Sequence, residues 1–294
     1  MYLNDLLLLL EGRGVIPSNY ADDNSLSVAA NIREGVITKV EEILRLLLQW
    51  FSDNLMKANI EKFQFMLLSP NVNSDENCTV IVNNVTIENL DECKLLGVYI
   101  DKGLSYSKHI NTICSKANAK LLALKRLANF LTVDCRLSLL RSFIVCHYLY
   151  CAALLHFSNK KLKDKIERTV YRGLKLVFND YKSTYDELLK RANMDSLELQ
   201  RQKAIITEMY KCLKGIGPEY LRDVFNFRSN GRRGPIFDEP RVRTAKFGTH
   251  SLRAYGPKLW NRLHIDIRTA ENLTYFKTQL KNFEGLACRC AFNM

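Results

Sequence analysis

Two adjacent aspartates, Asp22 and Asp23, are the residues whose type and spacing most readily suggest metal chemistry. They follow Tyr20 and Ala21, and short segments with strand character lie on both sides of this tetrapeptide. A tight hairpin can hold two successive carboxylates at its tip, and Mg²⁺ prefers oxygen ligands such as carboxylates. The alternative is a polar turn whose aspartates only bond backbone N–H groups. The pair alone leaves both interpretations open.

The elements that must position this tetrapeptide can be inferred from apolar spacing. Residues 15–30 are expected to form a strand, a turn and a second strand, and Pro17 restricts the first arm to an edge or late-starting strand. Four further elements are expected in this first part: a helix at 37–59, a buried strand at 63–69, a hairpin at 79–87 about Asn83-Asn84, and a strand at 94–101 that contains Gly97.

From about residue 107 the apolar spacing becomes helical and stays helical. Helices are expected at 107–131, 134–156, 160–178, 195–214 and 270–284. Residues 226–250 are polar and rich in Gly, Pro and Arg, which is typical of a linker. The predicted fold class is therefore α+β, with hairpins and a helix first and an α-helical remainder.

Charge is distributed unevenly along the 294 residues, whose formal net charge is +12. Residues 1–110 carry 9 basic and 15 acidic side chains, 111–225 carry 21 and 11, and 226–294 carry 13 and 5. A basic remainder of this kind predicts a polyanionic partner. The alternative is a solvated, lysine-rich surface without a partner.

Cysteine usage and hydropathy indicate the compartment. Nine cysteines form no CxxC pair, which argues against a disulfide framework and for a reducing environment. The apolar run from Leu6 to Leu10 is too short to span a bilayer and has no basic segment before it. We therefore expect an intracellular protein, in the cytoplasm or nucleus, that is not secreted and has no membrane partner.

Four ordered blocks resemble the reverse transcriptases of LINE-type, non-LTR retrotransposons of the jockey-like branch. They are "YLNDL" (2–6) with Tyr20-Ala21-Asp22-Asp23, "LLLQWFSDNLMKANIEKFQFML" (46–67), "CKLLGVYIDKGLSYSKHI" (93–110), and "RTAKFGTHSLRAYGPKLWNRLHIDIRTAENLTYFKTQLK" (243–281). The sequence departs from the family pattern at three places, with Phe63 for Thr, Tyr106 for Trp and His264 for Pro. The resemblance covers nearly the whole chain.

The resemblance implies roles for residues of the first part. Asp22 would be the primary ligand of a two-Mg²⁺ site and Asp23 the secondary one, with Tyr20 beside the primer terminus. Two such ions, roughly 3.5–4 Å apart, activate the primer hydroxyl and neutralise the leaving pyrophosphate. Lys62 would be a general acid toward pyrophosphate, or else an ordinary surface lysine. Gly97 would lie in the primer-grip hairpin, where a small residue lets the backbone meet the primer.

The resemblance also implies that the basic helices form a thumb along an RNA template–DNA primer duplex. Its cations would neutralise phosphates without sequence preference, and the alternative is that they line solvated helix faces. The residues concerned are Lys116, Lys120, Lys125, Arg126, Arg136 and Arg141.

The implied organisation is the C-terminal half of a polymerase palm (1–110), a helical thumb (111–225), and a basic linker with a helical extension (226–294). Family members carry fingers and another palm aspartate ahead of the "YLNDL" block, so the sequence is expected to begin inside the palm. The expected function is that of a fragment of an RNA-directed DNA polymerase, with dNTP as substrate of the intact enzyme, inactive alone. The alternatives are a non-catalytic nucleic-acid-binding remnant and an inert relic.

Overall fold

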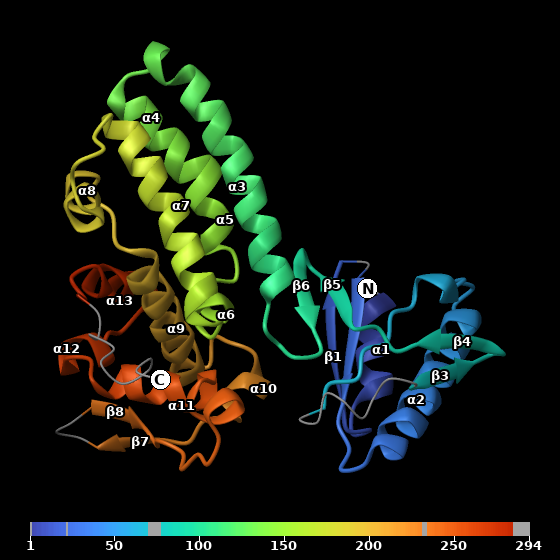
Figure 1. Cartoon of the computed structure of the whole chain (residues 1–294). Helices are drawn as coiled ribbons and strands as arrows, with labels where there is room; N and C mark the ends of the chain where they lie inside the picture. Colours follow the sequence, from blue (N-terminus) through green and yellow to red (C-terminus); the bar gives the residue numbers. More distant parts are fainter. Residues whose placement is uncertain (1, 22, 70–77, 231–233, 285–294) are drawn as a thin grey trace. The chain divides into compact units, whose positions relative to one another are not determined.

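The computed structural model describes residues 2–21, 23–69, 78–230 and 234–284 (Figure 1). The chain consists of two compact units, Met1–Ser105 and Tyr106–Met294. The first unit combines helices with antiparallel hairpins, and the second is mainly helical. The chain is therefore a mixed α+β protein with small antiparallel hairpins, as the sequence predicted.

The first unit contains two long helical segments and three hairpins. Its elements are α1 (Tyr2–Leu10), β1 (Val15–Tyr20), β2 (Asp23–Val28), α2 (Arg33–Asp53), the 3₁₀ turn η1 (Ile60–Lys62), β3 (Thr79–Val82), β4 (Val85–Glu88), β5 (Glu92–Leu95) and β6 (Val98–Asp101). Each strand pairs with its neighbour in sequence, as β1–β2, β3–β4 and β5–β6.

Helix α2 organises the first unit because one of its faces is apolar. Ile43 and Leu47 on that face are buried and belong to one core cluster with Leu6, Leu10 and Val15, which come from α1 and β1. On another side of the helix, the Glu41 carboxylate accepts a hydrogen bond of 2.9 Å from the backbone N–H of Ile81 in β3.

Two hairpin turns in this unit have left-handed backbone at both central residues. The turn residues have φ of +47° at Asn83 and +62° at Asn84, and of +44° at Leu96 and +86° at Gly97. Such turns suit the twist of a two-residue hairpin. The first was predicted and is confirmed. The prediction of one strand over 94–101 was wrong, because the chain reverses at Leu96-Gly97.

The predicted strand at 63–69 is almost absent from the structure. One isolated parallel bridge joins Phe65 to Asn89. The side chain of Asn89 also accepts a hydrogen bond of 2.9 Å from the backbone N–H of Leu67, which is buried. The segment is thus held by side-chain capping and burial more than by strand pairing.

The second unit contains most of the helices and one hairpin. Its elements are α3 (Ser107–Leu127), α4 (Val133–Leu139), α5 (Cys146–Leu149), α6 (Ala152–His156), α7 (Lys160–Phe178), α8 (Tyr185–Arg191), α9 (Leu197–Lys214), α10 (Glu219–Arg222), β7 (Phe227–Asn230), β8 (Gly234–Phe237), α11 (Leu252–Asn261), α12 (Ile265–Arg268) and α13 (Leu273–Leu280), with a 3₁₀ turn η3 (Ala128–Phe130) and π-helical segments η4 (Leu140–Val145) and η5 (Ala245–Thr249).

Residues 134–156 do not form the single helix that their apolar character predicts. Helix α4 continues into η4 and then into α5, and the path breaks before α6. At the break Tyr150 has extended backbone and Cys151 has φ of +52°. A π-helical segment widens the turn, and the break at Cys151 then separates α5 from α6.

Two apolar clusters form the interior of the second unit. The first lies among α3, η4, α7 and α8 and includes Ile110, Leu140 and Leu174. In the second, Tyr210 of α9 stacks on Phe276 with ring centroids 4.2 Å apart, and the Trp260 indole N–H donates to the Pro235 carbonyl at 3.0 Å.

The described residues after 226 therefore pack in the same unit as α9, whereas the sequence suggested a separate segment. The stretch interpreted as a linker contains the β7–β8 hairpin. Phe237 of β8 is buried among aromatic rings, including those of Phe225 and Trp260. The stretch 226–250 therefore contributes a core residue, Phe237, as well as polar residues.

Candidate functional site

The tetrapeptide Tyr20-Ala21-Asp22-Asp23 lies at the tip of the β1–β2 hairpin. The antiparallel register places Tyr20 opposite Asp23 at this end of the hairpin. Ala21 has φ of +54°, a left-handed conformation that costs a residue with a Cβ on the order of 1 kcal/mol. Asp22, the predicted primary metal ligand, lies outside the described residues.

The described side chains at the tip face solvent. Tyr20 is 67% exposed, and Asp23 is exposed as well. No described residue bonds the Asp23 carboxylate, either as a hydrogen-bond donor or as a cation. The tip thus presents an aromatic ring and a carboxylate that are both accessible to a ligand.

The implied Mg²⁺ site was tested against the side chains that the structure describes. Within residues 2–21, 23–69, 78–230 and 234–284, no three His, Cys, Asp or Glu side chains form a group that could hold a metal ion. Mg²⁺ needs several oxygen ligands in near-octahedral geometry. The described residues therefore supply Asp23 as one accessible carboxylate and do not form a metal site by themselves.

Lys62 lies at the end of η1, in the same unit as the hairpin. The Asn59 side chain begins this turn by accepting a hydrogen bond of 3.1 Å from the Glu61 N–H. The Lys62 side chain is exposed, and among the described residues no hydrogen bond or ion pair joins it to Asp23. The structure thus leaves Lys62 accessible without bringing it to the carboxylate.

Gly97 occupies the tip of the β5–β6 hairpin. Its φ of +86° lies in a region that glycine adopts without strain, so the turn alone explains the residue type. Its neighbours Leu95 and Leu96 are exposed. The contact of this tip with a primer stays a prediction.

The four predicted cations of α3 do not share one face. Lys116 and Lys120 are one turn apart, whereas Lys125 is nine residues from Lys116, or about half a turn around the helix.

Lys120 points to α5, where its Nζ lies 2.9 Å from His147 Nε2. Burial and the nearby charges of Lys120 and Lys116 lower the pKa of His147. Lys116, Lys125 and Arg126 are exposed.

Arg136 and Arg141 bind main-chain carbonyls at the ends of other helices. Arg136 donates to the Leu176 carbonyl of α7 at 3.3 Å, and Arg141 donates to the Ala192 carbonyl after α8 at 2.6 Å. Both carbonyls lie at helix C-termini, where a cation is favourable, and the Leu176 carbonyl also accepts from the Asn179 N–H at 3.4 Å. The two arginines therefore have a structural role at these helix ends.

A row of cations on α7 was not predicted from the sequence. It comprises five residues at alternating spacings of four and three, which we call the α7 row: Lys161, Lys165, Arg168, Arg172 and Lys175. The spacing is a signal present in the sequence, because residues three and four apart share a helix face.

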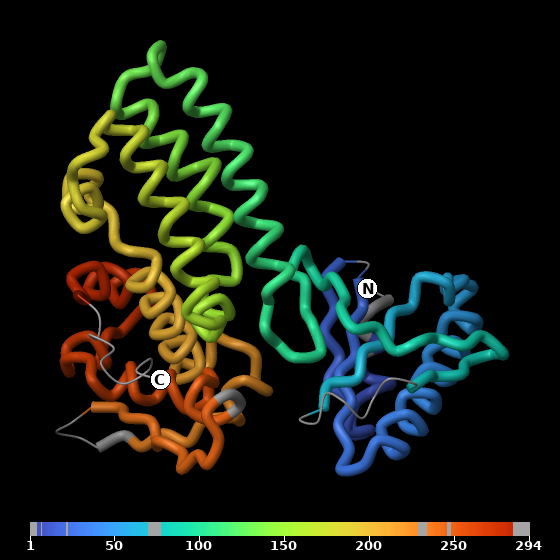
Figure 2. Tube along the Cα trace, viewed as in Figure 1, coloured from blue at the N-terminus to red at the C-terminus, as the bar shows by residue number. Residues whose placement is uncertain are grey.

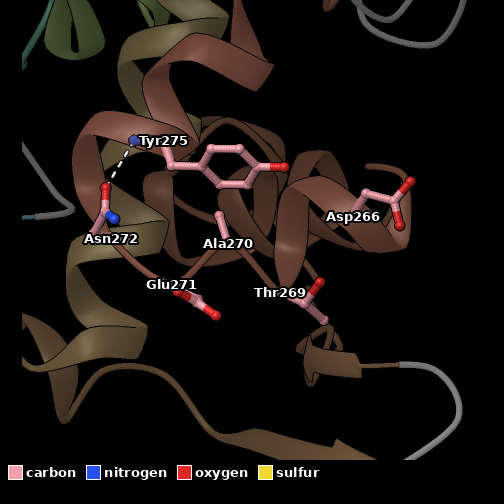
Figure 3. A pocket seen from close by; sticks show the side chains of 6 residues that line it. All are labelled: Asp266, Thr269, Ala270, Glu271, Asn272 and Tyr275. Carbon is pink, nitrogen blue, oxygen red and sulfur yellow. Dashed lines mark hydrogen bonds between the residues drawn. The ribbon is translucent and has the colours of Figure 1, made fainter.

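A shallow polar pocket lies between α12 and α13 (Figure 3). Its lining includes the carboxylates of Asp266 and Glu271, and the Tyr275 N–H donates to Asn272 Oδ1 at 2.8 Å. Two carboxylates disfavour a phosphate ligand. The lining of this pocket therefore does not suit a phosphate group.

Comparison with protein-family models, curated proteins and solved structures gives no match for this chain. None of the described helices combines the length and the apolar character needed to cross a membrane.

Proposed function

We propose that the chain is the palm-and-thumb part of a reverse transcriptase of a LINE-type, non-LTR retrotransposon. The observation that carries the proposal is the β1–β2 register, because it pairs Tyr20 with Asp23 at the end of a hairpin, with both side chains exposed. The order of the four sequence blocks supports the same assignment. The first unit would correspond to part of the palm and the basic second unit to the thumb.

In such an enzyme Asp22 and Asp23 would hold Mg²⁺, which activates the primer 3′-hydroxyl for attack on the dNTP α-phosphate. Tyr20 would pack beside the primer terminus, and the exposed Lys62 would protonate pyrophosphate. RNA template and DNA primer are the proposed partners. A two-ion site of this family needs another palm aspartate, so the 294-residue chain is expected to be inactive alone.

Primer extension on poly(rA)/oligo(dT) with Mg²⁺ or Mn²⁺ tests this function. The chain alone is expected to extend no primer. Addition of a second polypeptide that carries the fingers and the missing palm aspartate of a related element is expected to restore extension, because the two pieces complete the site.

Asp22→Asn is the decisive variant in the restored system and is expected to abolish extension. Extension by the chain alone would contradict the predicted inactivity. Extension that survives both Asp22→Asn and Asp23→Asn, or that is never restored by any related partner, would overturn the assignment to this enzyme class.

The alternative function is nucleic-acid binding without catalysis, through the second unit. It is favoured by exposed cations that no described carboxylate neutralises, among them Lys116, Lys125 and Arg126. Filter binding at low and high salt tests it, since phosphate neutralisation predicts a steep salt dependence. A flat salt response without measurable affinity would exclude it.

A further inference from the structure

We infer that the α7 row is a binding surface for the phosphate backbone of a nucleic-acid duplex. The inference rests on the proposed nucleic-acid binding by the second unit and deepens it, because it assigns a surface that the α3 lysines do not include and names a duplex as the ligand. Its first and last cations are fourteen residues apart on one helix, or about 21 Å along the helix axis. That length equals the axial rise of about six phosphates of one strand.

Four of the five cations of the α7 row are held in place by neutral groups. Lys165 Nζ donates to Asn111 Oδ1 at 2.6 Å, and Arg172 donates to Asn118 Oδ1 at 3.0 Å. Arg168 Nε donates to the main-chain carbonyl of Asp164 at 3.2 Å. Lys175 Nζ lies 4.1 Å from the centroid of the Tyr171 ring. These contacts restrict the side chains without cancelling their charge.

The amide partners come from α3, which contacts α7. Figure 2 shows the traces of both helices in the second unit. Asn111 and Asn118 are seven residues apart, as are Lys165 and Arg172, so the pairing repeats along the two helices. A carboxylate at either asparagine position would form an ion pair and remove a positive charge from the surface.

Other cations of the second unit show the contrasting arrangement. Arg201 lies 3.0 Å from both Glu167 and Glu198, and Lys203 lies 2.8 Å from Asp195. No member of the α7 row forms an ion pair with a described residue. The row is therefore an unneutralised part of the positive charge on a single helix face, and most of its side chains are ordered, which suits a polyanion.

A duplex fits this surface better than a single strand. Proteins that bind single strands present exposed aromatic rings on which bases stack. The aromatic residue of α7 that contacts the row is Tyr171. Its ring lies under Lys175 and near Tyr185, and its hydroxyl donates to the Ser183 carbonyl at 2.9 Å. That ring is therefore not available for stacking.

The test measures the affinity of the full chain for a fluorescent 20-base-pair duplex between 50 and 200 mM salt. In the row variant, Lys161, Lys165, Arg168 and Arg172 are all changed to Gln, which keeps the helix propensity high. Four lost phosphate contacts lower the slope of log K against log [salt] by roughly 3.6. The duplex affinity of the wild type should therefore fall about 150-fold more than that of the row variant across this range.

A matched control removes four exposed lysines outside α3 and α7: Lys182, Lys190, Lys214 and Lys277, each changed to Gln. Its salt slope is expected to change by less than about 1. Equal changes in the slopes of the control and the row variant would overturn the inference. Circular dichroism and the melting temperature of each variant show whether it is folded.

A second pair of variants tests the surface while keeping every cation. Asn111→Asp with Asn118→Asp is expected to lower the salt slope by about 2, because it neutralises Lys165 and Arg172 in place. Asp164→Asn is expected to raise duplex affinity, since that exposed carboxylate flanks the row. Unchanged duplex binding in the asparagine variants would overturn the inference.

Two further probes distinguish other polyanions. A single strand of equal length and phosphatidylserine vesicles are both expected to lose less affinity than the duplex in the row variant. A loss confined to vesicles or to the single strand would overturn the assignment to a duplex. All these measurements are independent of Asp22 and Asp23, so the proposed function and this inference can fail separately.

Discussion

At the scale of single residues, the second unit encloses a polar network that connects four helices. Arg201 of α9 is 1% exposed and bonds Glu167 of α7 and Glu198 of α9, each at 3.0 Å. The Tyr185 hydroxyl of α8 donates to Glu167 at 2.6 Å. His156 of α6 completes the network, with its Nδ1 3.5 Å from Glu198.

The imidazole of His156 stays neutral in the folded chain. Burial lowers its pKa to about 4, opposed by the Glu198 charge and reinforced by Lys163, Arg201 and His250. In the unfolded chain the same group has its ordinary value of 6.5. The unfolded state therefore binds a proton first as pH falls, so the contribution of His156 to stability is present above pH 6.5 and is lost toward pH 4.

His156→Gln is expected to flatten the pH dependence of stability. In the wild type, His156 accounts for a loss of about 2 kcal/mol in the free energy of unfolding between pH 7 and pH 5. The variant is expected to be less stable than the wild type at pH 7. Its free energy of unfolding is expected to fall less between pH 7 and pH 5, because it lacks the titration of His156. Urea unfolding followed by Trp260 fluorescence, in a Trp50→Phe background, measures the second unit at both pH values.

His109 and His147 also have lowered pKa values, mainly because of burial, but they are present in both proteins and cancel in the comparison. Parallel pH profiles for the wild type and the variant would contradict the assignment of the titration to His156.

At this scale the sequence predicted the types of the site residues but not their partners. The YADD tetrapeptide and its hairpin could be inferred because Tyr20 and Asp23 are neighbours in sequence. The functions of Arg136 and Arg141 could not, because their carbonyl partners are 40 and 51 residues away. The charge of an arginine alone does not show whether it binds a phosphate or caps the end of a helix.

At the scale of elements, α7 and the π-helical segment η4 approach each other closely. A Cβ at Gly173 of α7 would overlap the Leu140 side chain of η4. Leu140 belongs to the first apolar cluster of the second unit, and Gly173 is buried as well. The absence of a side chain at Gly173 is what allows this approach.

Gly173→Ala is expected to destabilise the chain by about 1 kcal/mol or more. Alanine gains about 1 kcal/mol in helix propensity, but overpacking against Leu140 costs typically 1–3 kcal/mol. The melting temperature of the variant measures the balance of the two effects.

Gly35→Ala in α2 serves as the control, because a Cβ there meets its nearest atom at an ordinary 3.4 Å. It is expected to be neutral or stabilising. A rise in melting temperature in both variants would contradict the close packing of α7 on η4.

Elements were predictable where local signals agree. The predicted range 160–178 of α7 matches the structure, because Asn159 caps its start and Asn179, with φ of +51°, ends it. The β7–β8 hairpin was missed because its polar turn residues outnumber its apolar ones, and Phe237 becomes core only through α11 and α9. Tertiary contacts of this kind leave no periodic signal in the sequence.

At the scale of the whole molecule, the chain divides between Ser105 and Tyr106, at the start of α3. The sequence suggested boundaries at 110 and 225. The second of these is absent as a unit boundary because Tyr210, Trp260 and Phe276 share one cluster. Apolar residues on both sides of residue 225 bury the same interior surface.

A polypeptide of residues 106–294 is expected to fold by itself, because both apolar clusters of the second unit lie within it. Its Trp260 unfolding transition should agree with that of the full chain within about 1 kcal/mol, and its duplex affinity should be retained. Urea unfolding and the salt titration described above measure both. A fragment that does not fold, or that binds duplex with a flat salt response, would contradict this division.

The arginine caps at the ends of α7 and α8 affect how a mutational scan of this basic chain must be interpreted. Arg136→Ala or Arg141→Ala would lower nucleic-acid retention by loosening the helical bundle, although neither guanidinium needs to touch a phosphate. Variants of the α7 row would instead weaken retention with the melting temperature unchanged. A scan that measures binding alone would assign phosphate contacts to the two arginine caps and to the α7 row alike. A stability measurement on each variant distinguishes the two sets of residues.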